Sequence, residues 1–173
     1  KSSLSELNKY RTAIRNEAVE NASRGIAEGK RVFTLTAPTG AGKTIALLSI
    51  ANMIQSQQGN YGIIYSLPFL SITEQVENIL KQMGIDYIAI NSKSQNKEAE
   101  TLYEKYENNP TYNSLQDVLK SDFAEQTFDH PFIVTTFVQF FETLISNRNS
   151  TLLKLPNFAK KIFLIDEIQS LPP

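Results

Sequence analysis

The stretch TAPTGAGKT at residues 36–44 constrains the fold of this 173-residue chain more than any other feature. It follows an apolar run, RVFTLTAP at 31–38, and it precedes KTIALLSIANMIQSQ at 43–57, which is apolar nearly all round a helix. A glycine-rich loop between a buried strand and a buried helix is the context that a phosphate-binding loop requires. The loop therefore favours an α/β fold in which this helix packs on a sheet.

Five short runs predict strands that are buried on both faces. They are rich in Val, Ile, Phe and Tyr and mostly do not alternate with polar residues, which is typical of parallel strands covered by helices. The runs lie at 31–38, 61–68, 85–92, 131–137 and 161–167. Helical patterns separate them at 5–28, 43–57, 70–83 and 137–147. The alternation predicts an α/β fold with a mostly parallel sheet, helices on both faces and right-handed crossovers.

Composition limits the functions and the cellular environment that are expected for this chain. The formal net charge is −1, so a nucleic acid would have to be bound through local contacts rather than by a basic surface. The chain has no cysteine, which excludes disulfides and thiolate chemistry and agrees with a reducing cytoplasm. It shows no signal peptide and no apolar run of membrane length, so no membrane association is expected. The polar stretch 93–129 predicts a surface insertion whose charges are solvated.

The residue types of the loop fit the binding of nucleotide phosphates. Gly40 and Gly42 allow positive φ, so successive backbone N–H groups can form a concave anion site at a helix N-terminus. Lys43 can reach the β- and γ-phosphates, and the Thr44 hydroxyl can ligate Mg²⁺. The predicted nucleotide-binding residues of the loop are Ala37, Pro38, Thr39, Gly40, Ala41, Gly42, Lys43 and Thr44. The alternative is a glycine-rich turn with an incidental lysine, and Ala37 replaces the glycine that opens the general pattern.

A second candidate feature is the acidic pair Asp166 and Glu167, which follows the apolar run IFLI at 162–165. Ligands of parallel α/β sheets bind at the carboxyl ends of the strands, where both this pair and the phosphate loop are expected. Asp166 would position Mg²⁺ through its hydration shell, and Glu167 would orient and deprotonate the attacking water. With Lys43, the pair makes up the predicted catalytic set. The alternative is two acids that merely end a strand at the surface.

Hydroxyl groups follow two other predicted strands. Ser71 begins the helix after the second strand, and Thr135 and Thr136 end the fourth strand. Hydroxyls and N–H groups at helix starts suit contacts with phosphodiester groups. Ordinary helix capping is the alternative, and Ser71 with Glu74 fits a capping box.

Four motifs, taken together, are similar to those of one family: TLTAPTGAGKT, YSLPFLSITEQ, FIVTTFVQFFETLISNR and KIFLIDEIQSLP. The chain resembles the first RecA-like domain of the helicase-nuclease that marks type I CRISPR systems, a superfamily 2 helicase of the DEAD/DEAH-box-like kind. The second and third motifs are the most specific, and the A-x-T-G-x-G-K-T form of the loop matches superfamily 2. The resemblance covers nearly the whole chain and is weakest over 93–129.

The resemblance implies a motor that uses ATP and Mg²⁺ to pull single-stranded DNA through a cleft between two RecA-like domains. A guide-RNA surveillance complex would recruit it to an opened target in a prokaryotic cytoplasm. An HD-type nuclease domain and the second RecA-like domain would be fused or separate, because the single histidine, His130, cannot form the nuclease metal site. The chain begins with Lys1 rather than Met and stops soon after Asp166 and Glu167. Residues 1–173 are therefore expected to be a partial helicase domain that binds ATP but hydrolyses it slowly.

The same resemblance implies further site residues. Arg11 or Arg15 would lie near the adenine, and Gln169 would couple the γ-phosphate site to the neighbouring domain. The expected contacts with the DNA backbone are Ser71, Thr73, Thr135 and Thr136. Two alternatives stay open: another superfamily 2 motor, such as an RNA helicase or a restriction-type translocase, and a nucleotide-independent docking module.

Overall fold

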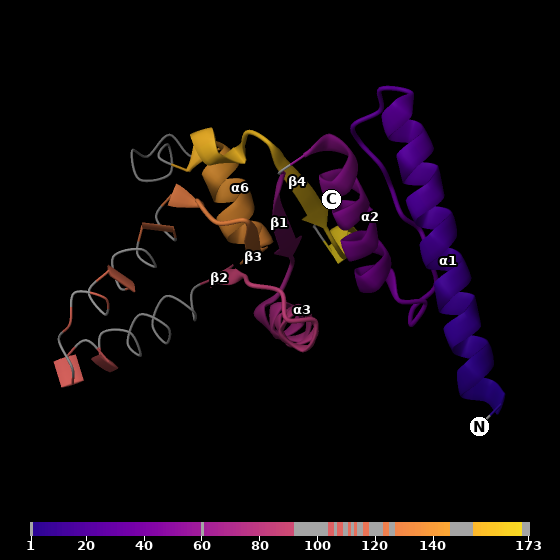
Figure 1. Ribbon diagram of the computed structural model, residues 1–173, viewed down its shortest axis with the longest axis horizontal. Helices are drawn as coiled ribbons and strands as arrows, with labels where there is room; N and C mark the ends of the chain where they lie inside the picture. Colours follow the sequence, from indigo (N-terminus) through magenta and orange to yellow (C-terminus); the bar gives the residue numbers. More distant parts are fainter. Residues whose placement is uncertain are drawn as a thin grey trace. The chain divides into compact units, whose positions relative to one another are not determined.

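The computed structural model of the chain describes residues 2–59, 61–91, 104–105, 107–108, 111, 113, 116–117, 123–124, 127–145 and 154–170. The chain divides into two compact units, Lys1–Tyr61 and Gly62–Pro173. Figure 1 shows two helices in the first unit and strands interleaved with helices in the second. The insertion predicted at 93–129 lies largely outside the described residues, although 104–105 and 107–108 are helical and exposed. None of the described helices is long and apolar enough to cross a membrane.

The first unit contains α1 (Ser2–Ala27) and α2 (Lys43–Gln58), which match the helices predicted at 5–28 and 43–57. Gly29, two residues beyond the end of α1, is left-handed with φ 84°. The N–H of Gly29 donates to the carbonyl of Ile26 at 2.9 Å, so the helix end is closed by a C-terminal glycine motif. The two helices contact each other, and Gln57 Nε2 donates to Ser23 Oγ at 3.0 Å.

The prediction of a strand at 31–38 is wrong, because these residues have no regular secondary structure. A strand needs a neighbour that satisfies its backbone N–H and C=O groups, and the described part of the first unit contains no strand. The apolar side chains of the segment are partly uncovered as a result, and Val32 is 87% exposed. Phe33 packs over Gly25 of α1, where a Cβ would come within 2.5 Å of its ring.

The second unit contains a four-stranded parallel sheet in the order β2-β3-β1-β4. Its strands are β1 (Gly62–Leu67), β2 (Ile88–Ile90), β3 (Phe132–Thr136) and β4 (Lys161–Ile165). The described part of this unit also includes the helices α3 (Leu70–Gln82) and α6 (Phe137–Ile145) and the short 3-10 turns η1 (Leu155–Phe158) and η2 (Ile168–Ser170). These elements confirm the predicted parallel α/β class and four of the five strands, although β2 is shorter than the predicted 85–92.

The strand order predicts which faces of the sheet the helices cover. From β1 the chain passes through α3 and returns two positions away at β2, whereas from β3 it passes through α6 and returns two positions away in the other direction, at β4. Right-handed crossovers in opposite directions place their helices on opposite faces. The winding therefore reverses between the neighbouring strands β1 and β3. In parallel sheets, ligands bind beyond the carboxyl ends of strands at such a point.

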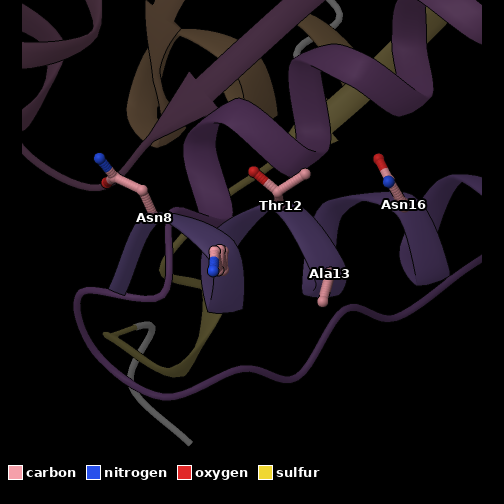
Figure 2. A pocket seen from close by; sticks show the side chains of 5 residues that line it. Asn8, Thr12, Ala13 and Asn16 are labelled. Atoms are coloured by element: carbon pink, nitrogen blue, oxygen red, sulfur yellow. The ribbon is translucent and has the colours of Figure 1, made fainter. Parts of the chain in front are cut away.

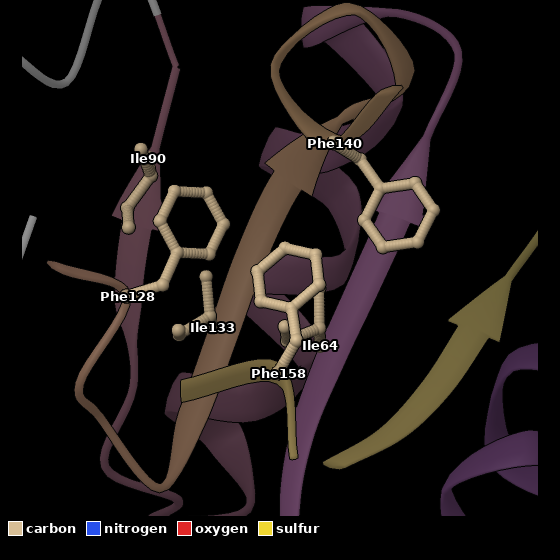
Figure 3. Close-up of a cluster of buried hydrophobic side chains, with 6 residues drawn as sticks. All are labelled: Ile64, Ile90, Phe128, Ile133, Phe140 and Phe158. Carbon is tan, nitrogen blue, oxygen red and sulfur yellow. The ribbon is translucent and has the colours of Figure 1, made fainter. Parts of the chain in front are cut away.

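An apolar cluster next to α6 forms one part of the core of the second unit (Figure 3). Its buried members are Ile64, Ile90, Phe128, Ile133, Phe140 and Phe158. Ile64 of β1 and Ile133 of β3 are register partners, so they lie side by side on one face of the sheet. Phe140 of α6 stacks on Phe158, with ring centroids 5.9 Å apart and ring planes at 12°. This packing holds α6 and the turn before β4 against the sheet.

Candidate functional site

The phosphate loop of the first unit folds around two glycines in the left-handed region. Gly40 has φ 78° and Gly42 has φ 83°, so the positive φ that the sequence allowed for is adopted at both positions. The N–H of Ala41 donates to the carbonyl of Pro38 at 3.1 Å and closes a β-turn whose third residue is Gly40. A turn with positive φ at its third position favours glycine there, because a Cβ would clash with the backbone.

The loop leads directly into the N-terminus of α2. Gly42 is the N-cap, and its carbonyl accepts a hydrogen bond from the N–H of Ala46 at 3.0 Å. The N–H groups of a first helical turn have no partner within the helix. No side-chain cap bond forms at this end among the described residues. These groups carry the positive end of the helix dipole, so the turn that contains Lys43 and Thr44 can hold a phosphate.

Arg11 of α1 contacts the phosphate loop within the first unit. Its Nε donates to the carbonyl of Gly40 at 2.9 Å, and its Cγ lies 3.8 Å from a Cβ built on Gly42. The bond gives the Gly40 carbonyl a donor and restrains the peptide between Gly40 and Ala41 within the loop. Sequence reasoning expected Arg11 or Arg15 near the adenine and missed this contact. Arg15 lies partly buried on α1, and its contact with adenine stays a prediction.

α1 also carries a polar stripe, formed by Asn8, Thr12 and Asn16 at intervals of four residues (Figure 2). With Lys9 and Ala13 these residues line an open depression on the helix surface. Amide and hydroxyl groups offer both donors and acceptors, so the stripe can bind a neutral polar group. Sequence reasoning did not select these residues, because polar side chains at helical spacing are usual on an exposed helix face.

In the second unit, Asp166 and Glu167 directly follow β4. The N–H of Asp166 donates to the carbonyl of Ser66 at 3.1 Å, which extends the pairing of β4 with β1 by one residue. Both acidic side chains are partly buried rather than fully solvated. The prediction that the acids stand at the carboxyl end of a parallel strand is therefore confirmed.

Two donors hold the carboxylate of Asp166. The hydroxyl of Tyr65 in β1 donates to Oδ2 at 2.8 Å, and the N–H of Glu167 donates to Oδ1 at 2.9 Å. Sequence reasoning missed Tyr65 because it counted this residue among the apolar members of a buried strand. The register contains the signal. Tyr65 pairs with Leu164, and side chains two residues apart share a face, so Asp166 falls on the same side as Tyr65.

Glu167 has an unusual backbone conformation, with φ 56°. The left-handed region costs a residue with a side chain about 1–2 kcal/mol, so other contacts must hold it there. The carbonyl of Glu167 accepts from the N–H of Ser170 at 2.9 Å and from its Oγ at 2.8 Å. Gln169 Nε2 donates to Glu167 Oε2. The residue predicted to couple the site to another domain thus contacts the carboxylate predicted to activate water.

Two of the residues predicted to contact a DNA backbone are inaccessible. Thr73 and Thr135 are both 0% exposed. Their hydroxyls donate to the carbonyls of Leu70 at 2.6 Å and Ile90 at 2.8 Å, respectively. The expected direct contact is therefore wrong for these two side chains. The Thr73 hydroxyl instead bonds within the first turn of α3, and the Thr135 hydroxyl links β3 to the last residue of β2.

The other two predicted DNA contacts differ from each other. Thr136 Oγ1 accepts from the N–H of Gln139 at 3.4 Å, which agrees with the alternative that this residue caps a helix. Its side chain is also largely buried. Ser71 is exposed. It does not cap α3 as the sequence suggested, because Phe69 is the N-cap and its carbonyl accepts from Ile72 N–H at 3.1 Å. Ser71 therefore remains the accessible hydroxyl of the predicted set.

The donor atoms of these residues fit Mg²⁺ as a nucleotide partner. Among the described residues, no group of three or more His, Cys, Asp and Glu side chains could hold a metal on its own. Mg²⁺ bound with a nucleotide needs only one or two protein ligands besides phosphate oxygens and waters. Both oxygens of Asp166 accept one hydrogen bond each, so each keeps a lone pair. The Thr44 hydroxyl in the first unit is a hard oxygen donor of the same type.

Comparisons with known proteins identify the family. Residues 6–169 match the family described as type III restriction enzyme, res subunit. The chain is also 31% identical, over an alignment of 186 residues, to the CRISPR-associated nuclease/helicase Cas3 of Haloferax volcanii. That alignment covers 96% of this chain and 19% of the relative, so the chain spans less than a fifth of that protein's length. The chain belongs to the res-subunit family of type III restriction enzymes, and it is a RecA-like superfamily 2 helicase domain related to that of Cas3.

Proposed function

We propose that this chain is the ATP-binding part of a CRISPR-associated DNA helicase that translocates on single-stranded DNA. Two separate observations support the proposal: a glycine loop formed at the start of α2 in the first unit, and a hydrogen-bonded Asp166–Glu167 pair after β4 in the second. Membership of a helicase family supports the motor. The similarity to a CRISPR-associated nuclease/helicase supports the assignment to CRISPR interference.

In the proposed site, the loop from Ala37 to Thr44 binds the triphosphate. Its backbone N–H groups surround the anion, and the Lys43 ammonium neutralises charge on the β- and γ-phosphates. Arg11 supports the loop through its hydrogen bond to the Gly40 carbonyl. Thr44 and Asp166 would hold Mg²⁺, which when bound neutralises charge on the phosphate oxygens.

Glu167 is proposed to act as the general base. Its carboxylate accepts a proton from the water that attacks the γ-phosphate, and it keeps that water in line with the leaving group. The left-handed backbone at Glu167 and the contact with Gln169 fix where the carboxylate points. Gln169 is proposed to report the state of this carboxylate to the neighbouring domain, since it can hydrogen-bond without titrating.

Single-stranded DNA is proposed to cross the carboxyl ends of β1 and β3. Ser71 offers an exposed hydroxyl there, and the first N–H groups of α3 suit a phosphodiester. Phe69 is 57% exposed at the same turn and offers an aromatic face on which a base can stack. Stacking and a few backbone contacts suit a chain whose net charge is only −1.

The proposed partners lie outside this chain. The relative is more than five times as long as the part aligned here, which leaves room for a second RecA-like domain and an HD-type nuclease domain. A guide-RNA surveillance complex in a prokaryotic cytoplasm is proposed as the recruiting partner. The match to a restriction-enzyme subunit favours one alternative, a translocase that moves on duplex DNA.

The proposed function can be tested by asking which nucleic acid stimulates ATP hydrolysis. ATP hydrolysis by the full-length protein should be stimulated more by single-stranded DNA than by duplex DNA or RNA of equal length, and Lys43→Ala should abolish the stimulation. Strongest stimulation by duplex DNA would indicate a restriction-type translocase, and strongest stimulation by RNA an RNA helicase. A folded protein that fails to bind Mg-ATP in calorimetry would indicate a docking module.

A further inference from the structure

We infer that Tyr65 is a positioning residue for the metal-binding carboxylate, and that its buried hydroxyl sets the orientation in which Asp166 meets the Mg²⁺ of the nucleotide. The inference rests on the proposed function, because it assigns a role within that site. It concerns only the second unit, where Tyr65 lies in β1 and Asp166 follows β4.

Three hydrogen bonds define the orientation of Asp166. Its N–H donates to the Ser66 carbonyl at 3.1 Å, its Oδ2 accepts from the Tyr65 hydroxyl at 2.8 Å, and its Oδ1 accepts from the Glu167 N–H at 2.9 Å. The terminal torsion of an aspartate is otherwise broad, because it joins sp³ and sp² carbons. With a donor on each oxygen, the carboxylate cannot rotate without breaking a bond. Tyr65 is the one of these donors that comes from a different strand.

Tyr65 is well placed to be a rigid support. It is 0% exposed, and β1 lies between β3 and β4, with Val134 and Leu164 as its register partners. A phenylalanine would fill the same space in this apolar surrounding, so packing alone does not require the hydroxyl. The buried hydroxyl instead needs a hydrogen-bond partner, and Asp166 provides one.

The arrangement leaves the carboxylate able to bind a cation. Each carboxylate oxygen has two lone pairs, and the two donors use one on each oxygen. The remaining lone pairs are available to a metal ion or to one of its waters. Partners that orient a metal-binding side chain in this way matter for affinity, and their loss typically weakens metal binding about 10–100-fold.

The chain also provides a matched control. Tyr87 donates its hydroxyl to Glu77 Oε2 at 3.1 Å. This is the same kind of tyrosine–carboxylate bond in the same unit, but Tyr87 immediately precedes β2 and Glu77 lies within α3. Tyr87 therefore lies at the amino end of a strand, whereas Asp166 lies at the carboxyl end of one, at the opposite edge of the parallel sheet. Tyr87→Phe removes a hydroxyl of the same chemistry without touching Asp166.

The test measures metal binding directly in the full-length protein. Mn²⁺ replaces Mg²⁺, and its binding to the complex with a non-hydrolysable ATP analogue is followed by electron paramagnetic resonance. Nucleotide affinity is also measured by calorimetry in EDTA. Tyr65→Phe should weaken Mn²⁺ binding by about 10-fold or more and leave nucleotide affinity in EDTA close to wild type. Tyr87→Phe should match the wild type in both measurements.

A second variant distinguishes the loss of the hydroxyl from an effect of the substitution on folding. Tyr65→Met also removes the hydroxyl, but its flexible side chain adapts to the space. A similar loss of Mn²⁺ affinity in every folded Tyr65 variant supports the inference. Wild-type Mn²⁺ affinity in a folded Tyr65 variant overturns it and leaves the proposed function standing. A wild-type protein that binds no nucleotide overturns the proposed function, and the inference falls with it.

Discussion

Arg11 and Gly40 are joined by a hydrogen bond between α1 and the phosphate loop, with 2.9 Å between the arginine Nε and the glycine carbonyl oxygen. The bond links residues 29 positions apart in the sequence. It fixes the peptide that joins Gly40 to Ala41, whose N–H also closes the turn to Pro38. The helix before the loop therefore helps to set the loop conformation, and nucleotide affinity is expected to depend on it.

Replacement of Arg11 tests this dependence. Arg11→Ala should weaken binding of a non-hydrolysable ATP analogue about 2- to 10-fold, because a hydrogen bond of this kind contributes about 0.5–1.5 kcal/mol. Calorimetry on the full-length protein measures the change. Arg24→Ala is the control, since Arg24 is an exposed arginine of the same helix that pairs with Glu20 instead. Equal affinities for the two variants would contradict a role for Arg11 in the loop.

The positive φ of Gly42 leads to a second prediction. Gly42→Ala forces a Cβ into the left-handed region and should destabilise the loop by about 1–2 kcal/mol. Loss of nucleotide binding is expected, because the N–H groups that follow would be misdirected. Gly29→Ala imposes the same strain at φ 84°, with no atom within 4 Å of the new Cβ, but at the end of α1. It should lower thermal stability comparably and leave nucleotide affinity unchanged, and any other pattern would argue against a special role for the loop.

The aromatic cluster leads to a prediction about stability. Phe140 is 3% exposed and contacts the rings of Phe141, Phe158 and Phe163. Phe140→Ala should lower the free energy of unfolding of the second unit by about 3–5 kcal/mol, through lost burial and the cavity that remains. Urea titration measures the loss. Phe69→Ala, at an exposed position, should change the free energy of unfolding by no more than about 0.5 kcal/mol.

The environment of Lys161 predicts that the free energy of unfolding depends on pH in the alkaline range. Burial lowers the pKa of Lys161 below the ordinary value of 10.5, and nearby Asp129 opposes the shift. Nζ also donates to the His130 carbonyl at 2.6 Å. Between the lowered folded-state pKa and 10.5, the unfolded chain binds more protons than the folded chain, so the free energy of unfolding rises with pH across that window.

The comparison with Lys161→Met isolates this contribution. The difference in free energy of unfolding, wild type minus variant, should increase as pH is raised through the alkaline range toward 10.5. Urea titrations at several pH values measure it, and the groups common to both proteins cancel in the difference. A difference that stays constant or falls with pH would show that the burial of the charged lysine is not what the folded state disfavours.

The sequence predicted the second unit well because its patterns are local. The apolar runs that became β1, β3 and β4 and the helix patterns at 70–83 and 137–147 each contain their own burial signal. The glycine loop was equally readable, since positive φ at Gly40 and Gly42 follows from residue type. The run at 31–38 failed for a different reason. Its apolar residues predict burial, but a strand also needs a neighbouring strand for its backbone hydrogen bonds. That neighbour cannot be predicted from the segment itself.

The site residues that the sequence misjudged were decided by contacts between distant segments. Thr73 and Thr135 carry hydroxyls at the expected places, yet their burial and their bonds to carbonyls depend on how neighbouring elements pack. Tyr65 and Asp166 are 101 positions apart and meet only through the register of β1 with β4. The chemical type of a residue was visible in the sequence, whereas its partner was not.

The central proposal is that Glu167 acts as the general base when this helicase hydrolyses ATP. The most direct measurement compares ATP hydrolysis and nucleotide binding by the full-length protein and its Glu167→Gln variant, in the presence of single-stranded DNA. The account predicts that hydrolysis falls about 10²–10⁴-fold, because a general base is lost, while affinity for Mg-ATP stays near that of the wild type. Hydrolysis at the wild-type rate in a folded Glu167→Gln protein would contradict the account.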